Sequence, residues 1–148
     1  MKFSRTIAFI AAVTGVLVIQ PVAHAGGAPH YLERTSGNGC TVAGGTYKYD
    51  LVGEGRYDAS ISGVFVKDKC DAKNRIKDGY GGTMRVVYRQ WTGSAWTSLY
   101  RDFALGADGS WDRGDGAYSW GEYDVADVRF QACNRNESTG YVGTCTPI

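Results

Sequence analysis

Histidine is scarce in this sequence, and its scarcity excludes the commonest nucleophilic enzymes. Of the two histidines, only His30 lies beyond the first 25 residues. Nucleophile pairs of the Ser-His and Cys-His types need a histidine that the fold holds beside the nucleophile. The cysteines form no Cys-x-x-Cys pair, which a zinc site would need in the absence of histidines. We therefore expect a non-enzymatic protein with no metal and no cofactor.

An excess of charge of either sign is also missing. The whole chain has a formal net charge of +1 at pH 7. Loss of the first 25 residues would remove Lys2 and Arg5 and lower that charge to −1. Nucleic acids and anionic membrane surfaces are bound through basic patches, which this balance does not supply. Neither is expected as a partner.

The one long hydrophobic run stands at the N-terminus. Lys2 and Arg5 precede the apolar run Ile7–Ile19, and the small residues of Ala23–Ala25 follow it. This pattern predicts a secretory signal peptide, residues 1–25. A membrane anchor would need about 20 apolar residues, and this run is shorter and interrupted. We expect a secreted product without a membrane span.

The four cysteines all lie beyond this segment, at positions 40, 70, 133 and 145. An even number in an exported chain indicates two disulfides. Three pairings are possible. Cys40–Cys70 and Cys133–Cys145 are favoured because each closes a compact segment. Each bridge would contribute about 2–4 kcal/mol, mainly by restricting the unfolded chain.

Glycine is abundant, with 21 residues, and it separates short runs of β-branched and aromatic residues. This pattern is typical of an antiparallel all-β domain. Residues 26–39 are expected to form a flexible leader, and residues 40–148 a single domain. Seven or so short strands predict a two-sheet sandwich, with a closed barrel as the alternative. The expected strands are 46–52, 57–67, 83–91, 96–103, 110–112, 117–120, 125–134 and 141–145.

The segment 83–103 predicts a hairpin with a definite register. Its four-residue loop, Thr92–Ala95, makes Trp91 and Trp96 cross-strand partners. Counting along both strands then places three pairs on one face and two on the other. The pairs are Trp91/Trp96, Val87/Tyr100 and Arg85/Asp102, and then Tyr88/Leu99 and Met84/Phe103.

Exposed aromatic residues provide the best functional candidate. Trp91, Trp96 and Tyr100 would share a face of this hairpin, with Trp111 and Trp120 in the following segment. Flat rings on a β surface can stack on sugars or anchor a protein partner. The alternative is that the same rings cap the core. The favoured function is a binding module for a glycan or a cell-envelope surface.

Two further segments suggest alternatives from other classes. The basic loop Lys67–Asp78 could contact an extracellular protein, as in a secreted inhibitor or antagonist, although a solvated loop or short helix pinned by the disulfide accounts for it better. The seven acidic residues between Asp102 and Asp127 could hold Ca²⁺, but turn chemistry accounts for them better. A small hydrolase that uses a carboxylate pair is the third possibility.

Overall fold

The computed structural model describes residues 27–70, 77–109 and 118–148. The predicted signal peptide, the predicted strand 110–112 and Trp111 lie outside these residues. Among the described residues there is no helix long and apolar enough to cross a membrane.

Seven antiparallel strands make up the described fold, with no helix. They lie in one hydrogen-bonded sheet of order β1-β2-β3-β6-β4-β5, and β7 pairs with β6. The sheet is not closed, so the barrel alternative was wrong. The strands are β1 (His30–Thr35), β2 (Thr41–Gly53), β3 (Arg56–Asp68), β4 (Tyr80–Trp91), β5 (Trp96–Gly106), β6 (Tyr118–Asn136) and β7 (Val142–Pro147).

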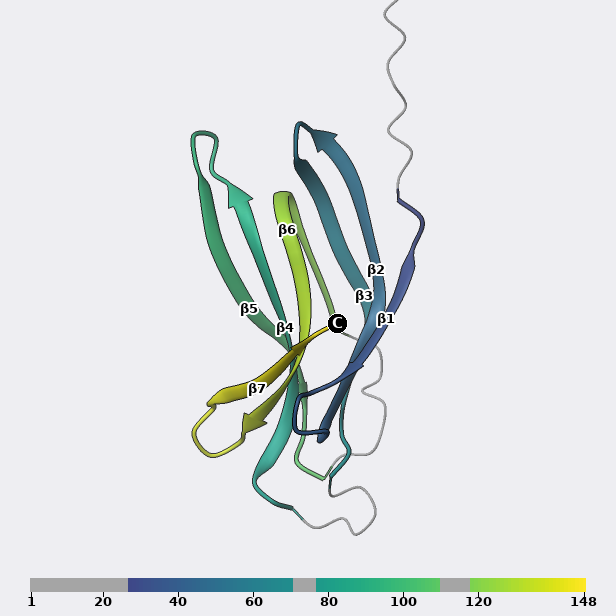
Figure 1. Ribbon diagram of the computed structural model, residues 1–148, viewed down its shortest axis with the longest axis vertical. Coiled ribbons are helices and arrows are strands. Elements are labelled where there is room, and N and C mark those ends of the chain that lie inside the picture. The colour runs from purple at the N-terminus through teal and green to yellow at the C-terminus, as the bar shows by residue number, and fades with distance from the viewer. Residues whose placement is uncertain (1–26, 71–76, 110–117) are drawn as a thin grey trace, which may run out of the picture.

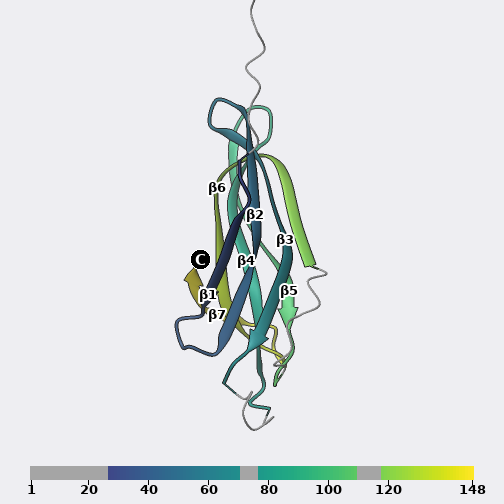
Figure 2. The same cartoon turned by 90° about the vertical axis from the view of Figure 1, so that its right-hand side faces the viewer.

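Strand β6 changes partners halfway along its length. Its first part pairs with β3, and its second part pairs with β4 and β7. The change occurs at Val125, which is opposite Tyr57 of β3 and Gln90 of β4. One continuous sheet thereby folds into two groups of strands, with β4 and β5 on one side of β6 and β1–β3 on the other (Figure 1). Both groups run along the same long axis (Figure 2).

The bend of β6 is made by two aspartates. Asp124 and Asp127 have positive φ values of 54° and 53°, a left-handed conformation that Asp adopts more readily than most residues. The pairing with both neighbours shifts register around them. The prediction of two separate strands, 117–120 and 125–134, was wrong, because the turn-like residues between them bend one strand without ending it.

The core fills the space between the two groups of strands. Trp120 and Phe130 of β6 pack edge to face, and Tyr88 of β4 packs against Trp120. Trp120 is only 4% exposed. The other buried residues of this cluster are Ala43, Ala59, Ile61, Val64, Val66, Met84, Val86, Ala104, Val125 and Ala132.

A bulge in β3 changes which side chains face the core. Unbroken alternation along the predicted strand 57–67 would point Ile61, Gly63 and Phe65 inward. Gly63 instead has φ = 60°, and the pairing with β6 shifts register there. Because a bulge adds one residue, the core positions beyond it are Val64 and Val66. Phe65 packs elsewhere and carries the Lys67 ammonium over its ring at 5.2 Å.

The first strand corrects a second expectation. His30–Thr35 lies within the segment expected to be a flexible leader, yet it pairs with β2 over six residues.

Both predicted disulfides are confirmed, Cys40–Cys70 and Cys133–Cys145. The two bridges indicate an oxidising environment.

Candidate functional site

The β4–β5 hairpin has the predicted register at its tip. Trp91/Trp96, Tyr88/Leu99, Val87/Tyr100 and Arg85/Asp102 are cross-strand partners. The Met84/Phe103 pair was wrong. A register shift after Met84 places that residue opposite Ala104, since Phe103 is the additional residue of a bulge.

Burial shows which face of the hairpin meets solvent. Met84, Val86 and Tyr88 belong to the core. Side chains alternate along a strand, so the residues between them point outward. The outward row on β4 is Arg85, Val87, Arg89 and Trp91, and its counterpart on β5 is Asp102, Tyr100, Ser98 and Trp96.

Three of the predicted binding residues, Trp91, Trp96 and Tyr100, lie on this outward face. The Trp91 and Trp96 rings lie 5.4 Å apart between centroids, tilted by 58°. Both tryptophans are partly exposed, and Tyr100 is 68% exposed. These rings are therefore not the core cap that was the alternative. Trp120 is the exception, because it lies in the core, where it cannot stack on a ligand.

Two of the three aromatic side chains on this face, Trp96 and Tyr100, contact an arginine. The guanidinium of Arg89 lies 5.1 Å from the Trp96 ring centroid, and that of Arg85 lies 4.7 Å from the Tyr100 ring centroid. Arg85 also donates two hydrogen bonds to the Asp102 carboxylate, at 2.8 and 3.0 Å. Hydrogen bonding to Asp102 raises the pKa of Arg85 above its ordinary value. These contacts restrain the Trp96 and Tyr100 rings.

The tryptophan pair also lines a cleft of about 400 Å³. The opposite side of the cleft is formed by Glu54 and Arg56, at the turn between β2 and β3. The tips of the two hairpins lie at the same end of the molecule (Figure 1). The sequence predicts the turn at Gly53–Gly55 but gives no signal that it meets Trp91 and Trp96, because that contact depends on how the sheet folds.

The two aspartates at the bend of β6 hold the arginines of this region. Asp124 pairs with Arg56 at 3.0 Å, and Asp127 pairs with Arg89 at 2.7 Å. Residues with unusual backbone conformations are often found at functional sites, where the surrounding structure maintains them. Here the bend brings both carboxylates toward the aromatic cleft. Sequence reasoning missed all four of these charged residues as parts of the site.

An acidic cluster lies elsewhere, around the start of β4. One carboxylate oxygen each from Asp68, Asp78 and Asp108 lies within 4.8 Å of the others. Asp68 and Asp108 are buried, and each accepts hydrogen bonds from two backbone amides. The carboxylates therefore tie loops together. Of the described acidic residues in the segment considered for Ca²⁺, only Asp108 belongs to this cluster.

A second acidic group lines a smaller pocket of about 250 Å³ beside the first half of β6. Asp50 and Asp58 are direct cross-strand partners, and Glu122 lies beside them, with Tyr123 at the edge. The Asp58 carboxylate accepts a hydrogen bond from the Asp124 amide at 3.3 Å. Three carboxylates therefore line this one pocket.

The basic loop Lys67–Asp78 lies partly outside the described residues, which omit positions 71–76.

Comparison with protein-family models, with curated proteins and with solved structures finds no match. The fold and the site together define a small disulfide-bonded β protein with an aromatic, arginine-supported cleft at one end.

Proposed function

We propose that this chain is a secreted, non-catalytic binding module that holds a polysaccharide of a cell envelope across the Trp91–Trp96 cleft. The observation that carries the proposal is the tryptophan pair, partly exposed on the outward face of the sheet and paired across two strands. Such a pair presents large apolar area with little side-chain freedom to lose on binding.

The surroundings of the pair suit a polyhydroxylated chain. Glu54 and Arg56 supply an acceptor and donors for hydroxyl groups on the far side of the cleft. Tyr100 extends the aromatic surface along β5, four residues from Trp96, or roughly 13 Å at the rise of a strand. A ligand several sugar units long would contact both rings.

Preorganisation favours binding at such a surface. A ring that is already fixed loses little freedom on binding, which lowers the entropic cost of association. Arg85 and Arg89 restrain the aromatic rings, and Asp102 and Asp127 restrain the arginines. Secretion, expected from the N-terminal segment, would bring this surface to the envelope.

Pull-down on insoluble polysaccharides tests the proposal. Residues 26–148 would be incubated with cellulose, chitin and peptidoglycan, beside the double variant Trp91→Ala/Trp96→Ala. Tyr31→Ala is the control, because Tyr31 is a 63% exposed aromatic residue on another strand. We expect at least one matrix to retain the wild-type chain and the control, with retention by the double variant reduced at least tenfold.

Two results would contradict the proposal. One is retention of a folded double variant at the wild-type level, which would place binding elsewhere. The other is the absence of retention on all three matrices. Circular dichroism of each variant shows whether it is folded.

The carboxylate-based hydrolase, third among the possibilities from the sequence, becomes the second candidate because Asp50, Asp58 and Glu122 line one pocket. Glycoside hydrolysis uses two carboxyl groups on either side of the scissile bond. Release of reducing sugar from the retained polysaccharide, abolished by Asp58→Asn, would establish this activity. No release by the wild-type chain would eliminate it for these matrices.

A further inference from the structure

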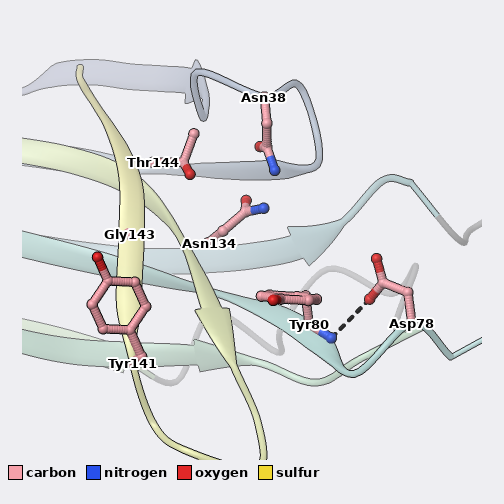
Figure 3. A pocket seen from close by; sticks show the side chains of 7 residues that line it. All are labelled: Asn38, Asp78, Tyr80, Asn134, Tyr141, Gly143 and Thr144. Atoms are coloured by element: carbon pink, nitrogen blue, oxygen red, sulfur yellow. Dashed lines mark hydrogen bonds between the residues drawn. The ribbon is translucent and has the colours of Figure 1, made fainter.

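A second pocket lies at the opposite end of β4 from the tryptophan cleft. Tyr80 begins this strand and Trp91 ends it, a span of roughly 35 Å at the rise of a strand. The pocket has a volume of about 400 Å³. Figure 3 shows its lining, which comes from the β1–β2 loop, the start of β4, the end of β6 and the β6–β7 hairpin: Asn38, Asp78, Tyr80, Asn134, Tyr141, Gly143 and Thr144.

Both disulfides flank this pocket. Asn134 directly follows Cys133, Thr144 directly precedes Cys145, and these cysteines are bonded to each other. Asn38 lies two residues before Cys40, which the other bridge ties to the end of β3. The lining residues of three separate segments are therefore held in place covalently.

The backbone at Thr144 is held in an unusual conformation. Its φ is 53°, a left-handed value that is a genuine outlier for a β-branched residue. Such conformations persist where the surrounding structure enforces them, often at ligand sites. Thr144 lines the pocket beside Gly143. A Cβ added at Gly143 would lie 2.9 Å from the Tyr141 ring, so glycine allows that ring its position.

Asn134 presents an unused donor to the pocket. It is only 8% exposed, and its amide oxygen lies 2.9 Å from the Ser36 hydroxyl and 2.8 Å from the Thr41 hydroxyl. Its amide nitrogen donates to no acceptor in the described parts of the chain. The two hydroxyl contacts orient the amide, and its nitrogen remains available to donate to a ligand oxygen in the pocket.

The lining selects one class of ligand. Tyr80 and Tyr141 are 44% and 72% exposed and offer ring faces. Asn38, Asn134 and Thr144 offer uncharged hydrogen-bonding groups, and Asp78 is the only charged lining residue. With no cationic side chain in the lining, an anion would meet only the negative charge of Asp78.

We propose that this pocket binds a neutral saccharide unit, with its ring against the tyrosines and its hydroxyl groups on Asn38, Asn134 and Asp78. The site is separate from the Trp91–Trp96 cleft and does not depend on it. It provides a second contact by which one copy of the chain could hold two parts of a polysaccharide, or two chains.

Titration followed by NMR tests this site. The probes are glucose, galactose and N-acetylglucosamine, with glucuronate as the anionic counterpart of glucose. We expect at least one neutral sugar to shift the side-chain amide signals of Asn134 and Asn38, and glucuronate to bind at least tenfold more weakly than glucose if glucose is that sugar. Tyr80→Ala/Tyr141→Ala should weaken binding at least tenfold.

The controls separate this site from the cleft. Tyr31→Ala changes a 63% exposed tyrosine of β1 that lies outside the pocket, and should bind like the wild type. Trp91→Ala/Trp96→Ala should also bind like the wild type here, even though it loses retention on polysaccharide. The proposal is overturned if no neutral sugar shifts the Asn134 amide, if glucuronate binds as well as the neutral sugar that binds most tightly, or if a folded Tyr80→Ala/Tyr141→Ala variant binds normally.

Discussion

Asp127 and Arg89 form an ion pair with an oxygen–nitrogen distance of 2.7 Å, and the same guanidinium lies over the ring of Trp96. This relationship links the bend of β6 to the aromatic surface. Asp127 has a left-handed backbone at the point where the pairing of β6 with β4 shifts register. Asp127 therefore bends β6 and also positions Arg89, which contacts the Trp96 ring.

The backbone at Asp127 can be tested separately from its carboxylate. Asp127→Ala and Asp127→Gly both remove the ion pair, but alanine pays about 1 kcal/mol or more for a left-handed conformation that glycine adopts freely. We expect the glycine variant to have the higher free energy of unfolding, by about 1 kcal/mol, in urea titrations. Equal stability of the two variants would show that residue 127 is not left-handed in solution.

The Arg85–Asp102 pair should contribute measurably to stability. Its geometry is bidentate, and the two side chains are only 22% and 27% exposed. Fully exposed pairs contribute about 0–1 kcal/mol, and bidentate contacts are stronger. We expect a coupling energy of about 1 kcal/mol from a double-mutant cycle of Arg85→Ala and Asp102→Ala. A coupling within error of zero would mean that the pair is not maintained in solution.

Two tryptophans should respond very differently to truncation. Trp120→Ala should destabilise the chain by about 3–5 kcal/mol, because it opens a cavity in the core. Trp96→Ala should cost about 1 kcal/mol or less, since its ring lies on the outward face. Thermal unfolding by circular dichroism measures both. A larger loss for Trp96→Ala than for Trp120→Ala would reverse the assignment of core and surface.

Alkaline pH should destabilise the fold through Tyr47. Burial, reinforced by the nearby tyrosines Tyr49 and Tyr57, raises the pKa of Tyr47 from 10.0 to about 12. Below pH 10 this phenol is protonated in both states. Between pH 10 and about 12 only the unfolded chain ionises it, so the free energy of unfolding falls as pH rises.

Tyr47→Phe removes this ionisation and provides the comparison. We expect the free energy of unfolding of Tyr47→Phe to decline less between pH 10 and 12 than that of the wild type, in parallel urea titrations. An identical decline would show that the Tyr47 phenol ionises equally in both states.

Local pattern in the sequence was enough to predict the tip of the β4–β5 hairpin. Loop length and alternation gave Trp91/Trp96 and Arg85/Asp102, because each pair depends only on residues near it in the chain. The prediction failed at Phe103 and Gly63, where bulges change the count by one residue. A bulge is set by contacts with a neighbouring strand, and a single strand's sequence carries little trace of it.

The two candidate binding regions differ in the same way. Trp91, Trp96 and Tyr100 share a face through local alternation and could be predicted. Glu54 joins them only because the sheet folds back at β6. No pattern in the sequence predicted the pocket around Asn134, because its lining comes from four segments that only the tertiary structure brings together. The disulfides were predicted as stabilising bridges, and the structure adds that both flank this pocket.

The most direct test of the central claim is the response of the tryptophan indole N–H signals to ligand. ¹⁵N-labelled residues 26–148 would be titrated with soluble oligomers of whichever polysaccharide retains the chain. We expect the Trp91 and Trp96 signals to shift in a saturable way, and the signal of buried Trp120 to stay in place as an internal control. Saturable binding that leaves the Trp91 and Trp96 signals unmoved would contradict the account.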